Sequence, residues 1–270
     1  MKEITITVSK ELSFLVFLRN LSNTPLEKKY VDRFGALNKS VLDSFFDESS
    51  NLRASELEEI FSEYGRIQES FPKILTCFWK NFCVLWDEQF PLLQRRVWEI
   101  ERRTGEIRTE WFDNIASFFK AGGFSKVNVL IVNNFLESGC GSSNRDCCVI
   151  LEPRNLYSND SEVIRRDLFV LFHELTHKIV SLSLLEDKAG NLRRKDLVFI
   201  LEWLIEIVTL PYFYNNPDQV LSKKLEHMPE FQRSFYKLIL DKNLFDYTKF
   251  SFEQIIDIAL THVRGRGADI

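Results

Sequence analysis

Histidine is scarce in this chain, and its scarcity limits where an imidazole ligand can come from. Only four histidines occur among 270 residues. They are His173, His177, His227 and His262, so the first 120 residues contain none. That N-terminal stretch therefore offers no imidazole to a metal or catalytic site.

Cysteines are also few, and their spacing is irregular. There are five, at positions 77, 83, 140, 147 and 148, and no two of them are spaced as C-x-x-C. An odd number without such a pair argues against a disulfide framework and indicates reduced thiols, as in a cytoplasmic protein.

Long apolar runs and an excess of positive charge are missing as well. No uninterrupted apolar stretch approaches the roughly 20 residues of a membrane span. The first residues, Met1–Thr7, alternate between polar and apolar types, which is not the pattern of a signal peptide. A net charge of −4 argues against a general nucleic-acid binder, which needs a basic surface. We therefore expect a soluble, cytoplasmic protein that binds neither membranes nor nucleic acids, with its oligomeric state left open.

Apolar periodicity predicts helices over most of the N-terminal part of the chain. The strand Glu3–Val8, which alternates with period two, precedes a helix from Lys10 to about Leu21. Helical patterns follow from Pro25 to Phe46, after Ser55, and from Pro72 to about Lys120, the last interrupted at Pro91 and near Gly105.

Gly122 and Gly123 mark a change of pattern. Strands are predicted at Val127–Phe135 and Cys147–Glu152, with a loop at Glu137–Asp146 between them. Further helices are predicted at Asn159–Leu182, Leu197–Leu210, Glu230–Leu240 and Phe252–Val263. We expect an α+β fold, mostly helical, in three segments: a mainly helical one (1–121), a core of strands and two helices (122–214), and a helical one (215–270).

The motif that carries chemistry is H-E-x-x-H, from His173 to His177. Four residues apart on one helix, the two histidines project from the same face and can reach one metal ion. Glu174 lies about 100° round the helix from His173, so it can act as a base without being a ligand. Two imidazoles and a carboxylate at this spacing are the parts needed to hold Zn²⁺ and to take a proton from a water.

The stretch Phe-His-Glu-Leu-Thr-His (172–177) resembles the active-site helix of the zincin superfamily of zinc metallopeptidases. The resemblance implies a small sheet packed on this helix, Zn²⁺ as cofactor, a peptide or protein substrate, and peptide-bond hydrolysis with Glu174 as general base. It also implies that an upstream edge strand binds extended substrate. The candidates for that edge are Cys147–Glu152 or the loop leading into it.

A third metal ligand is expected downstream. Position 183 is Ser, where the metzincin subclass carries a His, so the resemblance is to the gluzincins, which use a Glu from a second helix. Glu202 and Glu206 are the two charged residues of the apolar stretch Leu197–Leu210. Trp203–Glu206 resembles the Trp-Leu-x-Glu of aminopeptidase-like gluzincins and favours Glu206 as the ligand. Ile207 stands where that family carries Gly, which departs from its pattern. Glu202 is the alternative ligand, because Glu202 with an acidic residue four positions on resembles the thermolysin-like arrangement, in which the later carboxylate orients a histidine ligand.

In gluzincins a downstream Tyr or His stabilises the oxyanion, and His262, Tyr236 or Tyr247 could serve here. The sequence thus predicts a zinc peptidase. The competing hypothesis is a non-catalytic binding module derived from the zincin scaffold, with a structural or vestigial metal site.

Overall fold

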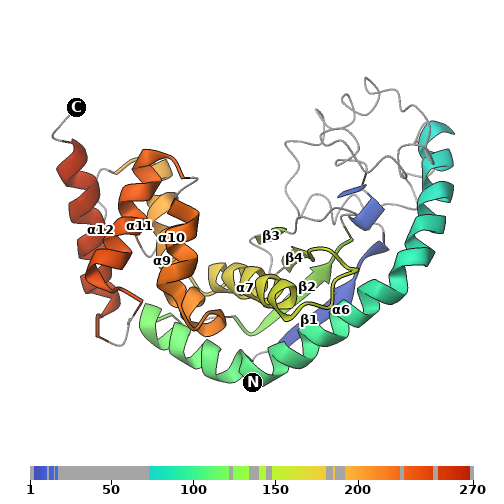
Figure 1. The fold of residues 1–270 in the computed structure, drawn as a ribbon, viewed down its shortest axis with the longest axis horizontal. Coiled ribbons are helices and arrows are strands. Elements are labelled where there is room, and N and C mark those ends of the chain that lie inside the picture. The colour runs from blue at the N-terminus through green and yellow to red at the C-terminus, as the bar shows by residue number, and fades with distance from the viewer. Residues whose placement is uncertain are drawn as a thin grey trace. The chain divides into compact units, whose positions relative to one another are not determined.

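The computed structural model describes residues 3–10, 12–14, 16–17, 73–121, 124–133, 140–143, 148–180, 185, 192–225, 228–245 and 249–267. The helices predicted at Pro25–Phe46 and after Ser55 lie outside these ranges. Figure 1 shows the elements, which are β1 (Glu3–Val8), α6 (Lys73–Phe119), β2 (Lys126–Ile131), β3 (Cys140–Ser143), β4 (Cys148–Glu152), α7 (Ser161–His177), α9 (Arg194–Phe213), α10 (Pro217–Leu225), α11 (Glu230–Lys242) and α12 (Phe252–Gly267).

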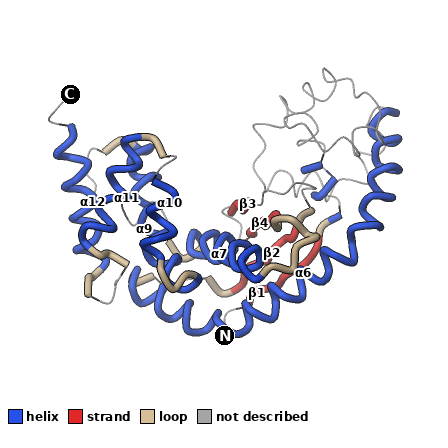
Figure 2. The backbone as a smooth tube through the Cα atoms, viewed as in Figure 1, coloured by secondary structure: helices blue, strands red, loops and turns tan. Residues whose placement is uncertain are grey.

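The described chain is mostly helical with one small sheet, which confirms the α+β class (Figure 2). The strand order is β1-β2-β4-β3. β1, β2 and β4 run parallel, whereas β3 is antiparallel to β4. The parallel pairing of β2 with β4 excludes a hairpin between these two strands.

The burial of each strand follows from its place in the sheet. Val127, Val129 and Ile131 of β2 are fully buried, and they alternate with more accessible positions. All five residues of β4, Cys148–Glu152, are buried, as expected of a strand flanked on both sides and covered on both faces.

Two predictions for this region were wrong. Residues 137–146 are not all loop, because Cys140–Ser143 forms β3. Cys147–Glu152 is not an edge, because β4 lies between β2 and β3 in the described sheet. The outer strands of the described sheet are β1 and β3, and β3 lies in the segment leading into β4, which was the second of the two candidates.

The expected interruptions of the long helix are also wrong. α6 runs unbroken through Pro91 and Gly105. Proline removes a backbone donor and costs about 3 kcal/mol inside a helix. Pro91 is exposed, and α6 buries large side chains on either side of it, among them Phe82 and Leu93. Burial of several such side chains, at about 1.5–3 kcal/mol each, outweighs that cost.

The chain forms two compact units, and each has its own core. The first comprises Met1–Thr104 and Ser125–Leu171, and the second comprises Gly105–Phe124 and Phe172–Ile270. Packing defines these units, whereas the predicted segments 1–121, 122–214 and 215–270 follow changes in sequence pattern.

The buried guanidinium of Arg96 connects α6 to α7 within the first unit. Arg96 of α6 forms an ion pair with Asp167 of α7, and the two side chains are 3% and 1% exposed. Arg96 also donates to the carbonyls of Arg154, Asn155 and Ser158, in the segment between β4 and α7. Asp167 in turn accepts a hydrogen bond from the Arg154 amide. One side chain thus holds the segment that leads into the H-E-x-x-H helix.

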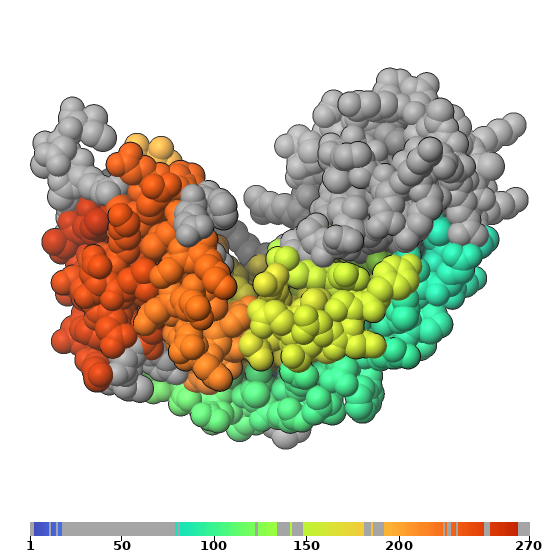
Figure 3. Space-filling view, viewed as in Figure 1, coloured from blue at the N-terminus to red at the C-terminus, as the bar shows by residue number. Residues whose placement is uncertain are grey.

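The second unit is built on α9, which is buried on almost every side. Trp203, Leu204, Ile205, Ile207 and Val208 are fully buried. α9 extends to Phe213, beyond the predicted end at Leu210, and its last turn closes with the Tyr214 amide donating to the Leu210 carbonyl. The atoms of α9 to α12, coloured from orange to red, lie against one another in Figure 3.

Aromatic contacts join the helices of this unit. Phe119, at the end of α6, packs on Phe252 of α12 with ring centroids 5.3 Å apart. Phe235 of α11 contacts both Phe199 and Trp203 of α9. These phenylalanines therefore pack helices of the second unit against one another.

Candidate metal centre

The last turns of α7 separate a buried face from a half-buried face. Phe172, Leu175 and Thr176 are fully buried, whereas His173 and His177 are half-buried. Thr176 Oγ1 donates to the Phe172 carbonyl at 2.7 Å and lies 3.5 Å from Thr209 Oγ1 of α9. Packing on one face of α7 therefore sets the direction in which the two imidazoles point.

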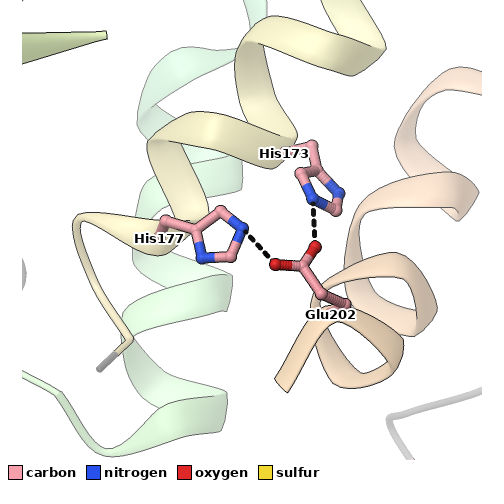
Figure 4. A group of neighbouring side chains, drawn as sticks. All are labelled: His173, His177 and Glu202. Atoms are coloured by element: carbon pink, nitrogen blue, oxygen red, sulfur yellow. Dashed lines mark hydrogen bonds and ion pairs between the residues drawn. The ribbon is translucent and has the colours of Figure 1, made fainter. Parts of the chain in front are cut away.

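The carboxylate of Glu202 reaches both imidazoles from α9 (Figure 4). Nε2 of His173 lies 3.0 Å from Oε2 of Glu202, and Nε2 of His177 lies 3.2 Å from Oε1. The two rings lie close to each other, with centroids 5.2 Å apart. Each imidazole thus faces a different oxygen of one carboxylate.

The imidazoles control the charge state of Glu202. Burial alone would raise the pKa of this carboxyl. The hydrogen bonds and charge interactions with His173 and His177 outweigh burial and lower the pKa to about 2. Glu202 is therefore ionised at every pH near neutrality, and its side chain stays 42% exposed, so solvent can reach it.

Glu206, one turn further along α9, is engaged elsewhere. It is 5% exposed, and its Oε2 accepts a hydrogen bond from the hydroxyl of Tyr236 on α11. Burial, followed by the neighbouring carboxylates of Glu206 and Glu202, raises the pKa of Tyr236 well above its usual range. Tyr236 therefore stays protonated and keeps donating to Glu206.

The donor atoms that converge here suit a divalent metal. His173, His177 and Glu202 each offer a ligand atom, and these atoms all lie within 4.8 Å of one another. Two imidazoles and one carboxylate form a ligand set that zinc uses in peptidases. Ligands on a tetrahedral zinc, with bonds of about 2.0–2.2 Å, lie roughly 3.3–3.5 Å apart. The imidazole nitrogens lie 3.0 and 3.2 Å from different oxygens of Glu202, and one ligand atom from each residue lies within 4.8 Å of the others, so modest shifts of the side chains would bring the three to this spacing.

The other predicted site residues lie as follows. Glu174 is half-buried on α7, next to His173. His262 of α12 is not part of this cluster: its Nε2 lies 3.1 Å from Ser234 Oγ, and its ring packs on Phe235. Tyr247 lies outside the described residues.

The sequence favoured Glu206 as the third ligand, but the carboxylate that converges on the imidazoles is that of Glu202. The bond between Tyr236 and Glu206 joins residues 30 positions apart, and nothing in the spacing of the sequence indicated it.

Comparison of the chain with known proteins identified no similar protein. No protein-family model, no curated protein and no solved structure matches this chain. None of the helices in the part of the chain that the structure describes is long and apolar enough to cross a membrane.

Proposed function

We propose that this protein is a zinc-dependent peptidase of zincin-like fold, in which His173, His177 and Glu202 hold the metal. The observation that carries the proposal is the convergence of Glu202, from a separate helix, on both imidazoles of H-E-x-x-H, at 3.0 and 3.2 Å. Three side chains of the types that zinc prefers, from two helices, thus meet at one point.

The residues of the chain divide the work of peptide hydrolysis. Zinc bound here would polarise the scissile carbonyl and acidify a water molecule. Glu174 accepts the proton of the attacking water and passes it to the leaving amine. Glu202 stays ionised, which supplies the negative charge that offsets a divalent cation between two neutral imidazoles.

The test compares the wild type with Glu174→Gln on a broad peptide library, with the zinc content of both proteins measured by mass spectrometry. Removal of a general base costs about 10²- to 10⁴-fold in rate, so cleavage is lost while zinc remains bound. Glu162→Gln is the matched control, because Glu162 lies on the same helix and pairs only with the exposed arginines 165 and 166 in the contacts described.

Two results would count against the proposal. A wild-type protein that binds zinc but cleaves nothing in the library favours the non-catalytic module with a structural or vestigial metal site. Equal cleavage by wild type and Glu174→Gln removes Glu174 from the mechanism.

A further inference from the structure

α9 carries two carboxylates on one side, and they have different partners. Glu202 and Glu206 are four residues apart, which brings their Cβ atoms to within about 5–6 Å of each other. Glu202 faces the imidazoles, and Glu206 accepts a hydrogen bond from Tyr236. Both are chemically suited to bind zinc, so α9 carries one more potential ligand than the third position of the centre needs.

Tyr236 is held firmly on the side of α9 that carries Glu206. The indole Nε1 of Trp203 donates to the carbonyl of Phe235, the residue before Tyr236, at 3.0 Å. The ring of Phe235 packs edge-on against Trp203, and Trp203 is fully buried. Because these contacts fix the backbone of α11 next to α9, the phenol hydroxyl has a fixed direction from which to donate.

We propose that Tyr236 is a positioning residue that decides which carboxylate binds the metal, by holding Glu206 toward α11 and leaving Glu202 to complete the site. The inference rests on the proposed function, because it concerns ligands of the same zinc. It also gives Tyr236 a task other than stabilising an oxyanion, since its proton is directed at Glu206.

The experiment asks whether loss of one hydroxyl restores zinc binding to a damaged site. Glu202→Gln removes the carboxylate ligand and is expected to weaken zinc binding at least 10-fold, as measured by competition with a chromophoric chelator. Adding Tyr236→Phe removes the hydrogen bond that holds Glu206 toward α11, so Glu206 can replace the lost ligand and the double variant recovers about 10-fold in affinity, the scale on which supporting residues affect metal sites. Adding Glu206→Gln as a third change abolishes this recovery.

A matched control and a second readout separate positioning from general stability. Tyr212→Phe in the Glu202→Gln background also removes a tyrosine hydroxyl of this unit, one that accepts from Asn114 at 2.8 Å, and it brings no recovery. The visible absorption of the Co²⁺-loaded proteins reports the ligand set directly. The spectrum of Glu202→Gln/Tyr236→Phe regains carboxylate-ligand character, and that of the triple variant does not.

The outcomes distinguish the two proposals. A wild type that binds no zinc overturns both. Wild-type affinity in Glu202→Gln overturns the ligand assignment and, with it, the role of Tyr236. Weakened binding in Glu202→Gln that Tyr236→Phe leaves unchanged or weakens further overturns only the positioning role and leaves the zinc site standing.

Discussion

Zinc bound at the proposed site is expected to raise the thermal stability of this protein by an amount that follows from the binding affinity. The proposed ligands come from two helices, with His173 and His177 on α7 and Glu202 on α9. A metal that joins them binds the folded chain and not the separated helices. At a free zinc concentration 100 times Kd, binding adds about 2.7 kcal/mol to the free energy of unfolding. For a chain of this size, that corresponds to a rise of roughly 5–10 °C in Tm.

The assay is calorimetric unfolding in zinc and in a chelator. The wild type is expected to lose the whole shift on chelation. In Glu202→Gln, a 100-fold weaker affinity at the same zinc concentration leaves only about 0.4 kcal/mol, which is a shift of about 1 °C. His262→Gln is the control, because His262 contacts Ser234 and Phe235 and lies outside the cluster; it keeps the full shift. A Tm of the wild type that ignores saturating zinc, or a full shift in His177→Gln, would refute the reasoning.

Three further predictions concern single features. Zinc affinity should fall between pH 8 and 5.5, because protons compete with zinc for imidazole nitrogens while the Glu202 carboxyl, with its pKa of about 2, stays ionised; a zinc affinity that does not change over this range would contradict the ligand assignment. Gly105→Ala should raise stability by about 0.8–1 kcal/mol in denaturant unfolding, since this helical position is exposed and an added Cβ meets nothing within 4 Å. Trp203→Phe should cost about 2 kcal/mol or more in the same assay, from the lost hydrogen bond to Phe235 and the cavity left behind; a change below 0.5 kcal/mol would mean that the contact contributes little.

Local patterns were sufficient where an element forms from its own residues. Glu3–Val8 was predicted with its full bounds because it alternates and is rich in β-branched residues. Cys140–Ser143 was missed because its composition, Cys-Gly-Ser-Ser, has little strand preference; it is a strand because it pairs with β4. Contacts beyond the local sequence also decide the length of α6, because burial of side chains on either side of Pro91 outweighs the local preference of proline for a helix break.

The sequence likewise predicts the part of the candidate site that lies on one helix, and not the part that depends on contacts between helices. One helix fixes the relation between His173 and His177, so their convergence follows from spacing alone. Which of Glu202 and Glu206 faces them depends on how α9 is rotated against α7 and α11. That rotation is set by contacts such as Thr176 with Thr209 and Trp203 with Phe235, which join residues about 30 positions apart. No short motif encodes such contacts.

The guanidinium of Arg96 also has a consequence for substitution. Its planar group of N–H donors bonds to one carboxylate and three backbone carbonyls, and the side chain is 3% exposed. A lysine there would keep the positive charge but bring three donors on one nitrogen, too few and too tightly clustered for four acceptors. Arg96→Lys is therefore expected to destabilise the fold as much as removal of the side chain. A mutational scan should find that even lysine is not tolerated at residue 96.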